Sequence, residues 1–365
     1  MEEELLALLT LLRLEGFGPA HARKLRQVWG SLAELWRKPP NAWPLRLQKY
    51  ATELKALRET SEQILQHCQT LGIRILPFWA AEFPPLLHTA VQPPAILYYK
   101  GTASLTDRLF VAVVGTRKPS VYGLKATEYF VEALVGAGIG IVSGLAYGID
   151  AQAHRSALAH KGVTLAVLAH GMDYVYPPAH RKLAEAILQQ GAWLSEYPPG
   201  VKPHPLHFPF RNRIMAALAQ ATLVIESREK GGALFTARMA FEANRLVYAV
   251  PGDIFAPTTR GTHGLIAEQV AQIAYDPAVI LKELQSQGAK LPLFNSPPPQ
   301  PSDPLQRRIY DILQEGPKHI DEVSAHLACP IPKLLATLVE MEVAGWICQR
   351  PGGFLIRQLP PDAIS

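Results

Sequence analysis

The chain has 365 residues, of which 48% are hydrophobic and 18% are charged, and its formal net charge is +5. These values are typical of a folded protein of two or three domains, and the mild positive charge permits a nucleic-acid partner without requiring one. Three scattered cysteines argue against a disulfide framework or a zinc site, and no apolar run reaches the ~20 residues of a membrane span. The acidic start, Glu2 to Glu4, is unlike a signal peptide, so we expect a cytoplasmic protein with no membrane partner.

Residues 1–72 are predicted to be helical. Leucines recur at helical spacing up to residue 12, and a second helical pattern follows the turn Gly16-Phe17-Gly18-Pro19. A glycine-rich turn between two helices can present backbone N–H groups to a DNA phosphate, or it can be a simple connection. Glu15 lies beside this turn and few basic residues do, so we favour the simple connection.

Residues 73–285 are predicted to form an extended Rossmann-like domain of the α/β class. Two short apolar runs, 73–78 and 95–99, precede it as a β-extension. From residue 109 onward, apolar runs alternate with helical patterns, which predicts a doubly wound parallel sheet with helices on both faces. The predicted strands are 109–114, 139–142, 163–168, 192–194, 222–225 and 246–250. The predicted helices are 122–135, 149–159, 179–189, 233–243 and 276–284.

A Gln-, Pro- and Ser-rich segment, 286–304, is predicted to be a linker. The following residues, 305–365, show three helical patterns and then two short apolar runs around Pro351-Gly352-Gly353, which is the arrangement of a winged helix. The third helix, 331–344, carries Lys333 as its only basic residue, so we do not expect it to read base edges in a major groove. A protein-contact or structural role is favoured for this domain.

Small residues follow several of the predicted strands. Gly115-Thr116-Arg117 ends the first strand of the parallel sheet, and Ser143-Gly144 ends the second. Gly231-Gly232 and Thr236 open a later helix. Ligands of open parallel sheets bind beyond the carboxyl ends of the strands, where small residues let backbone N–H groups approach an anion. The sequence therefore predicts a phosphate-binding rim, although it has neither a G-x-G-x-x-G nor a P-loop motif.

In the segment Phe208-Pro209-Phe210-Arg211-Asn212-Arg213, the last three residues are predicted to open a helix and to bind phosphate there through the two guanidinium groups. The phenylalanines could stack on bases. The alternative is that the arginines are solvated and the phenylalanines lie in the core. Between Lys202 and Arg245 there are seven basic residues against three acidic ones, which favours an anionic ligand.

The sequence shows no recognisable set of acid, base and nucleophile, so we expect no enzyme activity, no cofactor and no metal. Asp150 and His154 lie four residues apart on a predicted helix and could pair, in which case a hydrogen bond that fixes the helix start is the favoured interpretation.

Motifs in the loops of the predicted sheet resemble, in order, those of the DNA-processing protein A family (DprA, also called Smf) over residues 109–285. They are Val113-Val114-Gly115-Thr116-Arg117, Tyr122-Gly123, Ser143 to Asp150, Ala153-His154, Tyr176-Pro177, Ser195-Glu196, Phe208-Pro209, Arg211-Asn212-Arg213 and Pro251-Gly252. The flanks are similar too, with an N-terminal module like a sterile alpha motif or helix-hairpin-helix and a C-terminal winged helix. The resemblance implies a non-catalytic protein that binds and protects incoming single-stranded DNA, helps to load RecA during natural transformation, and forms a homodimer through the Rossmann-like domain.

The resemblance also implies which residues contact DNA. By position these are Arg117, Ser143, Gly144, Lys202, Phe208, Arg211, Asn212, Arg213, Gly232 and Thr236. Three places depart from the family pattern. They are Ala169-His170-Gly171, Gly231-Gly232-Ala233-Leu234, which lacks two hydroxyl donors, and Gln269-Val270.

An enzymatic alternative comes from a related Rossmann variant, the nucleoside-monophosphate phosphoribohydrolases. Their Pro-Gly-Gly-x-Gly-Thr motif is followed closely by a glutamate. Here Lys230 precedes Gly231-Gly232 and the next acid is Glu242, so this alternative is less favoured.

A dimer surface is predicted near residues 260–285, where apolar residues gather. They are Leu265, Ile266, Val270, Ile273, Ile280 and Leu281. For Ile273 and Leu281 we expect packing of the last helix against the sheet instead.

Overall fold

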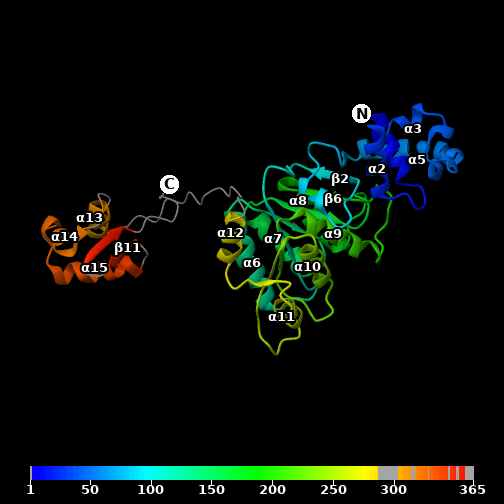
Figure 1. Ribbon diagram of the computed structural model, residues 1–365. Helices are drawn as coiled ribbons and strands as arrows, with labels where there is room; N and C mark the ends of the chain where they lie inside the picture. Colours follow the sequence, from blue (N-terminus) through cyan, green and yellow to red (C-terminus); the bar gives the residue numbers. More distant parts are fainter. Residues whose placement is uncertain are drawn as a thin grey trace. The chain divides into compact units, whose positions relative to one another are not determined.

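The computed structural model describes residues 2–286, 303–313, 316, 318–327, 329–343, 346–350 and 353–357. The chain divides into two compact units, Met1–Pro292 and Leu293–Ser365 (Figure 1). Most of the predicted linker, 286–304, lies outside the described residues.

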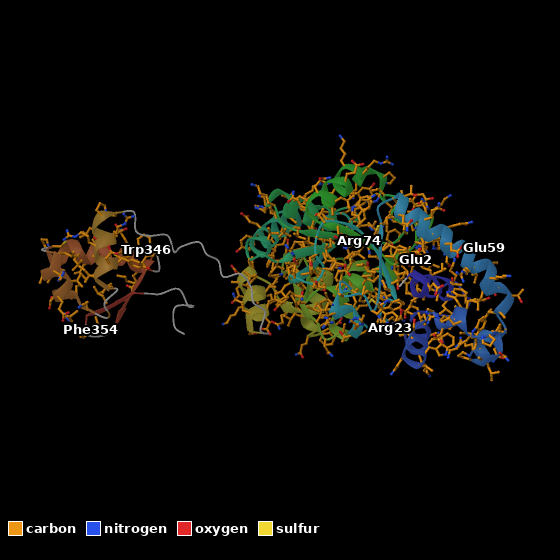
Figure 2. All side chains as sticks on the ribbon, turned by 90° about the horizontal axis from the view of Figure 1, so that it is seen from above. Glu2, Arg23, Glu59, Arg74, Trp346 and Phe354 are labelled. Atoms are coloured by element: carbon orange, nitrogen blue, oxygen red, sulfur yellow. The ribbon has the colours of Figure 1, made fainter. Side chains whose placement is uncertain are left out.

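The N-terminal part of the first unit is helical, as predicted. Its helices are α1 (Glu2–Leu11), α2 (Pro19–Trp29), α3 (Glu34–Arg37), α4 (Leu45–Gln48) and α5 (Ala51–Thr70), with a 3-10 turn η1 (Pro40–Ala42). Figure 2 shows Glu59 of α5 at the outer side of this helical part. The buried leucines of α1 share one hydrophobic cluster with Ala166 and Trp193 of the sheet. The helices therefore pack directly on the sheet, and the domain boundary at residue 72 stays a prediction.

The sheet has nine strands in the order β1-β2-β6-β5-β4-β3-β7-β8-β9. Strands β3 to β9 pair in parallel, and β1 and β2 extend one edge through antiparallel pairs, as expected for the β-extension. The strands are β1 (Arg74–Pro77), β2 (Ile96–Gly101), β3 (Phe110–Val114), β4 (Gly140–Ser143), β5 (Thr164–Leu168), β6 (Ala192–Ser195), β7 (Ala221–Val224), β8 (Leu246–Ala249) and β9 (Gln272–Ile273). After β6 the chain returns to place β7 on the other side of β3, so the topological switch point lies between β3 and β7.

Helices cover both faces of this sheet because its strands are apolar on both sides. Alternate residues of β3 belong to two clusters, one shared with α9 (His207–Leu218) and α10 (Gly232–Glu242), the other with α6 (Val121–Gly136), α7 (Ile149–Ala159) and α12 (Pro277–Ser286). The remaining elements of this unit are η2 (Pro85–Thr89), η3 (Pro178–His180), α8 (Arg181–Gln190) and α11 (Arg260–Ala267). Among the described residues, no helix has the length and apolar character needed to cross a bilayer.

Two expectations for the apolar residues between 260 and 285 are wrong. Leu265 and Ile280 are completely buried in the clusters beneath the helices, so they cannot form an exposed patch. Ile273 was expected to pack the last helix on the sheet, but it lies on the two-residue edge strand β9 and is 45% exposed. Leu281 is packed against the sheet, as expected.

The second unit has the three helices and the hairpin of a winged helix. Its elements are α13 (Pro304–Ile312), β10 (Lys318–His319), α14 (Ile320–Leu327), α15 (Ile331–Val343), β11 (Ile347–Arg350) and β12 (Phe354–Arg357). The sheet order is β10-β12-β11, and the short strand β10 was not predicted. Figure 2 labels Trp346, which directly precedes β11, and Phe354, the first residue of β12.

The suggested pair between Asp150 and His154 is wrong. The His154 ring lies in the core, where its Nδ1 is 2.7 Å from Thr164 Oγ1. The Thr164 hydroxyl uses its only proton to donate to the carbonyl of Ile141, so it must accept from the Nδ1–H of His154. In the neutral imidazole, Nε2 then carries no proton. Burial is the main cause that lowers the pKa of His154 to about 3.

The low pKa of His154 predicts acid sensitivity of the sheet. Between about pH 3 and pH 6.5 the unfolded chain holds one more proton at this residue than the folded chain, so acidification favours unfolding by about 1.4 kcal/mol per pH unit. We expect His154→Gln to remove about 2 kcal/mol of the stability difference between pH 7 and pH 5. Denaturant unfolding at both pH values measures this difference. The control His67→Gln, at an exposed position of α5, should leave the pH dependence unchanged, and an unchanged slope in His154→Gln would contradict the prediction.

Candidate nucleic-acid interface

A cavity of about 700 Å³ opens at the switch point between β3 and β7. Its walls come from the loop after β3, the start of α7, the first two turns of α9 and the loop that leads from β7 into α10. The lining residues are Val114, Gly115, Thr116, Arg117, Ala146, Asp150, Tyr176, Pro205, Phe208, Pro209, Arg211, Asn212, Met215, Ser227, Arg228, Lys230, Gly231, Gly232, Ala233, Phe235 and Thr236. Since all these loops lie at the carboxyl edge of the parallel strands, the cavity is where such sheets bind ligands.

The loop after β3 is held from both ends by Glu226. The amide of Thr116 donates to the carbonyl of Glu226 at 2.8 Å, and the amide and hydroxyl of Ser120 donate to its carboxylate at 2.9 and 2.6 Å. Arg117 lies between these two anchors, is exposed, and has its guanidinium carbon 5.8 Å from the centre of the Phe208 ring. Glu226 thus fixes the backbone around Arg117 while leaving the Arg117 side chain accessible.

Helix α9 begins at His207, so the expectation that Arg211-Asn212-Arg213 opens the helix is wrong. Pro209 is accommodated in the first turn, because the N–H groups of that turn have no partner within the helix. The arginines therefore lie in the second turn, away from the free N–H groups of the helix start.

The Arg211 guanidinium is buried in the floor of the cavity. Its Nη1 donates to the carbonyls of Gly144, at 2.7 Å, and Val167, and its Nε donates to Asn212 Oδ1 at 3.1 Å. Burial lowers the pKa of Arg211 to about 10, against the opposing effect of Asp150, so it stays charged at neutral pH. Burial also raises the pKa of Asp150, whose carboxylate accepts from the amide of Gly144 at 3.1 Å.

Arg213 points to a different part of the structure. It donates to the carboxylate of Glu196 and, at 2.6 Å, to the carbonyl of Gln92, and it is buried. These contacts use the guanidinium to hold α9 against β6 and the β-extension. A phosphate contact, which we had expected from Arg213, would have to replace them.

The loop into α10 supplies accessible positive charge. No side chain caps the N-terminus of α10 at Gly231, and a Cβ on Gly232 would meet nothing within 4 Å. Arg228 and Lys230 are exposed beside these glycines. Neither they nor Arg117 form an ion pair in the part of the chain that the structure describes. Three unpaired cations and an open helix start therefore face the same cavity.

Six of the ten predicted site residues line this cavity, namely Arg117, Phe208, Arg211, Asn212, Gly232 and Thr236. The other four do not. Ser143 is completely buried and donates to the carbonyl of Val113 at 2.7 Å, and Gly144 lies behind the Arg211 guanidinium. Lys202 is exposed but does not line the cavity, and the Arg213 guanidinium is hydrogen-bonded to Glu196.

Sequence reasoning missed four accessible lining residues and one that supports the cavity. Arg228 and Lys230 could have been found from their position beside Gly231-Gly232. Tyr176 and Phe235 are 42% and 44% exposed, and the Tyr176 and Phe208 rings are 5.7 Å apart. No local signal marks Glu226, because its role depends on Ser120 and on Thr258, both distant in sequence.

The fold and the site define a Rossmann-like protein with a basic, aromatic-lined cavity at the switch point of its sheet. Residues 74–285 match the family model for DNA recombination-mediator protein A, and residues 295–353 match that for the DprA winged helix domain. The chain is 36% identical to protein Smf of Escherichia coli K12 over 305 residues, which covers 82% of this chain and 81% of that protein.

Two solved structures support the same assignment. DNA processing protein A from Streptococcus pneumoniae is 36% identical with a TM-score of 0.58, covering 63% of this chain and 82% of that chain. DNA processing protein A from Helicobacter pylori, whose structure is described in terms of its single-stranded DNA binding mode, is 28% identical with a TM-score of 0.54, covering 59% of this chain and 96% of that chain. The chain belongs to the DprA/Smf family of DNA recombination mediators.

Gly144 should be required for the position of the Arg211 guanidinium. A Cβ at Gly144 would lie 2.4 to 2.5 Å from three guanidinium atoms of Arg211. We expect Gly144→Ala to lower the free energy of unfolding by about 1–3 kcal/mol, as overpacking does. The matched control Gly232→Ala has open space and should leave stability unchanged or raise it by up to about 1 kcal/mol. Equal stability of the two variants in denaturant unfolding would contradict the described contact.

Proposed function

We propose that this protein binds single-stranded DNA in the cavity between β3 and β7, protects incoming DNA during natural transformation, and helps to load RecA onto it. The observation that carries the proposal is the grouping of Arg117, Arg228 and Lys230 with exposed aromatic rings around one cavity. The family, and the single-stranded DNA binding described for the Helicobacter pylori relative, support the same ligand.

The geometry favours a ligand that is bound without sequence preference. The exposed guanidinium and ammonium groups and the uncapped start of α10 can bind phosphates, which carry no sequence information. The rings of Tyr176, Phe208 and Phe235 offer π-faces, and every base can stack on such a face. In this proposal the cavity holds DNA and catalyses no reaction, and as a partner of RecA the protein acts in the cytoplasm.

The proposed phosphate contacts predict that the affinity for DNA falls with salt, and that removing cations from the cavity makes this fall less steep. With three accessible cations at the cavity, the logarithm of the association constant for oligo-dT should fall with log[salt] with a slope of about −2, at roughly 0.7 per phosphate contact. We expect Arg117→Ala with Lys230→Ala to reduce this slope by about 1.4. Fluorescence anisotropy over a range of salt concentrations measures the slope.

The control for that experiment is Arg238→Ala, which removes an exposed arginine of α10 that pairs with Glu268 at 2.7 Å and does not line the cavity. It should bind DNA as the unmodified protein does. A slope that is the same in all variants would show that the cavity does not bind the phosphates. Release of free base from a nucleotide would instead favour a phosphoribohydrolase.

We also propose that the protein acts as a homodimer through the Rossmann-like domain. A single cavity offers few phosphate contacts, and two linked cavities on one strand would raise the avidity. The free edge of the sheet supports this idea, since Ile273 of β9 and the following Tyr275 are both exposed.

Ile273→Arg should therefore weaken self-association, because it places a charge in the centre of a two-fold contact. Light scattering at micromolar concentrations should show a lower mass than for the unmodified protein. Val28→Arg on α2, where the valine is also exposed, is the matched control and should leave the mass unchanged. If the unmodified protein is a monomer, or if Ile273→Arg dimerises normally, this surface is not the dimer contact.

A further inference from the structure

We propose that the DNA strand extends from the cavity onto the loop between β8 and α11, where Phe255 stacks on a base and Arg260 binds a phosphate. This inference rests on the proposed function and adds a second contact region, at residues 251–260, to the cavity. The ligand is the same class of molecule, a single strand longer than the one that fills the cavity.

The topology places this loop beside the cavity. Strand β8 pairs in parallel with β7, so the loops after the two strands leave the sheet at the same edge and next to each other. The amide of Gly261 donates to the carbonyl of Ser227 at 2.9 Å, and a Cβ on Gly261 would lie 2.5 Å from the carbonyl oxygen of Arg228. The start of α11 is therefore in direct contact with the wall of the cavity.

The loop is fixed to the opposite wall as well. Thr258 donates its hydroxyl to the carboxylate of Glu226 at 3.0 Å, and the same carboxylate accepts from Ser120 at the end of the Arg117 loop. Within the loop, the amide of Phe255 donates to the carboxylate of Asp253 at 2.8 Å, and Thr259 is buried. The backbone that carries Phe255 is thus ordered before any ligand binds.

This ordered backbone presents unusually accessible apolar side chains. Phe255 is 82% exposed and Ile254 is 70% exposed. At the start of the same loop, the Tyr122 hydroxyl donates to the carbonyl of Pro251 at 2.6 Å. Isolated exposed apolar residues are common, but two adjacent ones on a loop that leads into the cavity wall point to a partner.

The charges favour DNA over an apolar protein partner. Arg260 is exposed, opens α11 and, like Arg228, has no ion pair among the described residues. Asp253, the one acidic residue between residues 251 and 260, accepts a hydrogen bond from the amide of Phe255, so its carboxylate is bound to the loop backbone. An aromatic platform next to unpaired arginines is the combination that single-stranded nucleic acids bind. The surface from Arg228 through Arg260 to Phe255 then continues the cavity.

The experiment compares two oligonucleotides on the full-length protein, dT of about 5 and of about 15 nucleotides, the range covered by single binding sites. The variants are Phe255→Ala and Arg260→Ala. The controls are Phe241→Ala and Arg238→Ala, both on exposed positions of α10 outside the cavity lining. Anisotropy measures the affinities, and the unfolding midpoint of each variant shows that it is folded. Phe255→Leu and Arg260→Gln serve where an alanine variant is unstable.

We expect Phe255→Ala and Arg260→Ala each to bind the long oligonucleotide about 10-fold more weakly than the unmodified protein does. Their affinity for the short oligonucleotide should stay within about twofold of that of the unmodified protein. Arg260→Ala should also reduce the salt slope for the long oligonucleotide by about 0.7. Unchanged affinity for the long oligonucleotide overturns the inference, as does an equal loss for both lengths, which would place Phe255 in the cavity itself. Normal DNA binding combined with lost RecA loading would assign the surface to a protein. If the unmodified protein binds neither oligonucleotide, the proposed function fails and this inference fails with it.

Discussion

The buried guanidinium of Arg211 is the interaction on which the cavity between β3 and β7 depends. It joins α9 to the carbonyls of Gly144 and Val167, at the ends of two neighbouring strands, and it lies close enough to Asp150 for their charges to stabilise each other. A buried guanidinium is unfavourable unless its N–H groups have acceptors. The two carbonyls and the side-chain oxygen of Asn212 supply these acceptors for Arg211. Because α9 is fixed in this way, the Phe208 ring in its first turn is held at the cavity.

A second buried charge, on Glu226, organises the opposite wall. Its carboxylate has no cationic partner among the described residues and is stabilised by Ser120, Thr258 and the start of α6. The two buried charges therefore fix backbone, whereas the exposed cations Arg117 and Lys230 remain available for a ligand. Both kinds of residue matter to the proposed function, since exposed cations can contact phosphates only on loops that hold their position.

The sequence was sufficient for the sheet and for the location of the cavity, because continuous apolar runs and glycines at strand ends are local signals. It was not sufficient to distinguish Arg211 from Arg213. They are two residues apart with similar neighbours, but Arg213 is near Glu196 and Gln92, which only the fold brings together. The start of α9 was placed at Arg211 and not at His207, although the first turn of a helix tolerates a proline such as Pro209. Tyr176 was not predicted as a lining residue because its position next to Phe208 depends on tertiary packing.

The bond from Arg213 to the carbonyl of Gln92 has a mechanical consequence. Gln92 lies in the connection between β1 and β2, which follows the N-terminal helices, so the helix that forms one wall of the cavity is fastened to the region where those helices join the sheet. Movement of α9 away from β6 would therefore break this bond and disturb the connection that leads from the N-terminal helices into the sheet. The position of one cavity wall is in this way coupled to the core that the N-terminal helices share with Trp193.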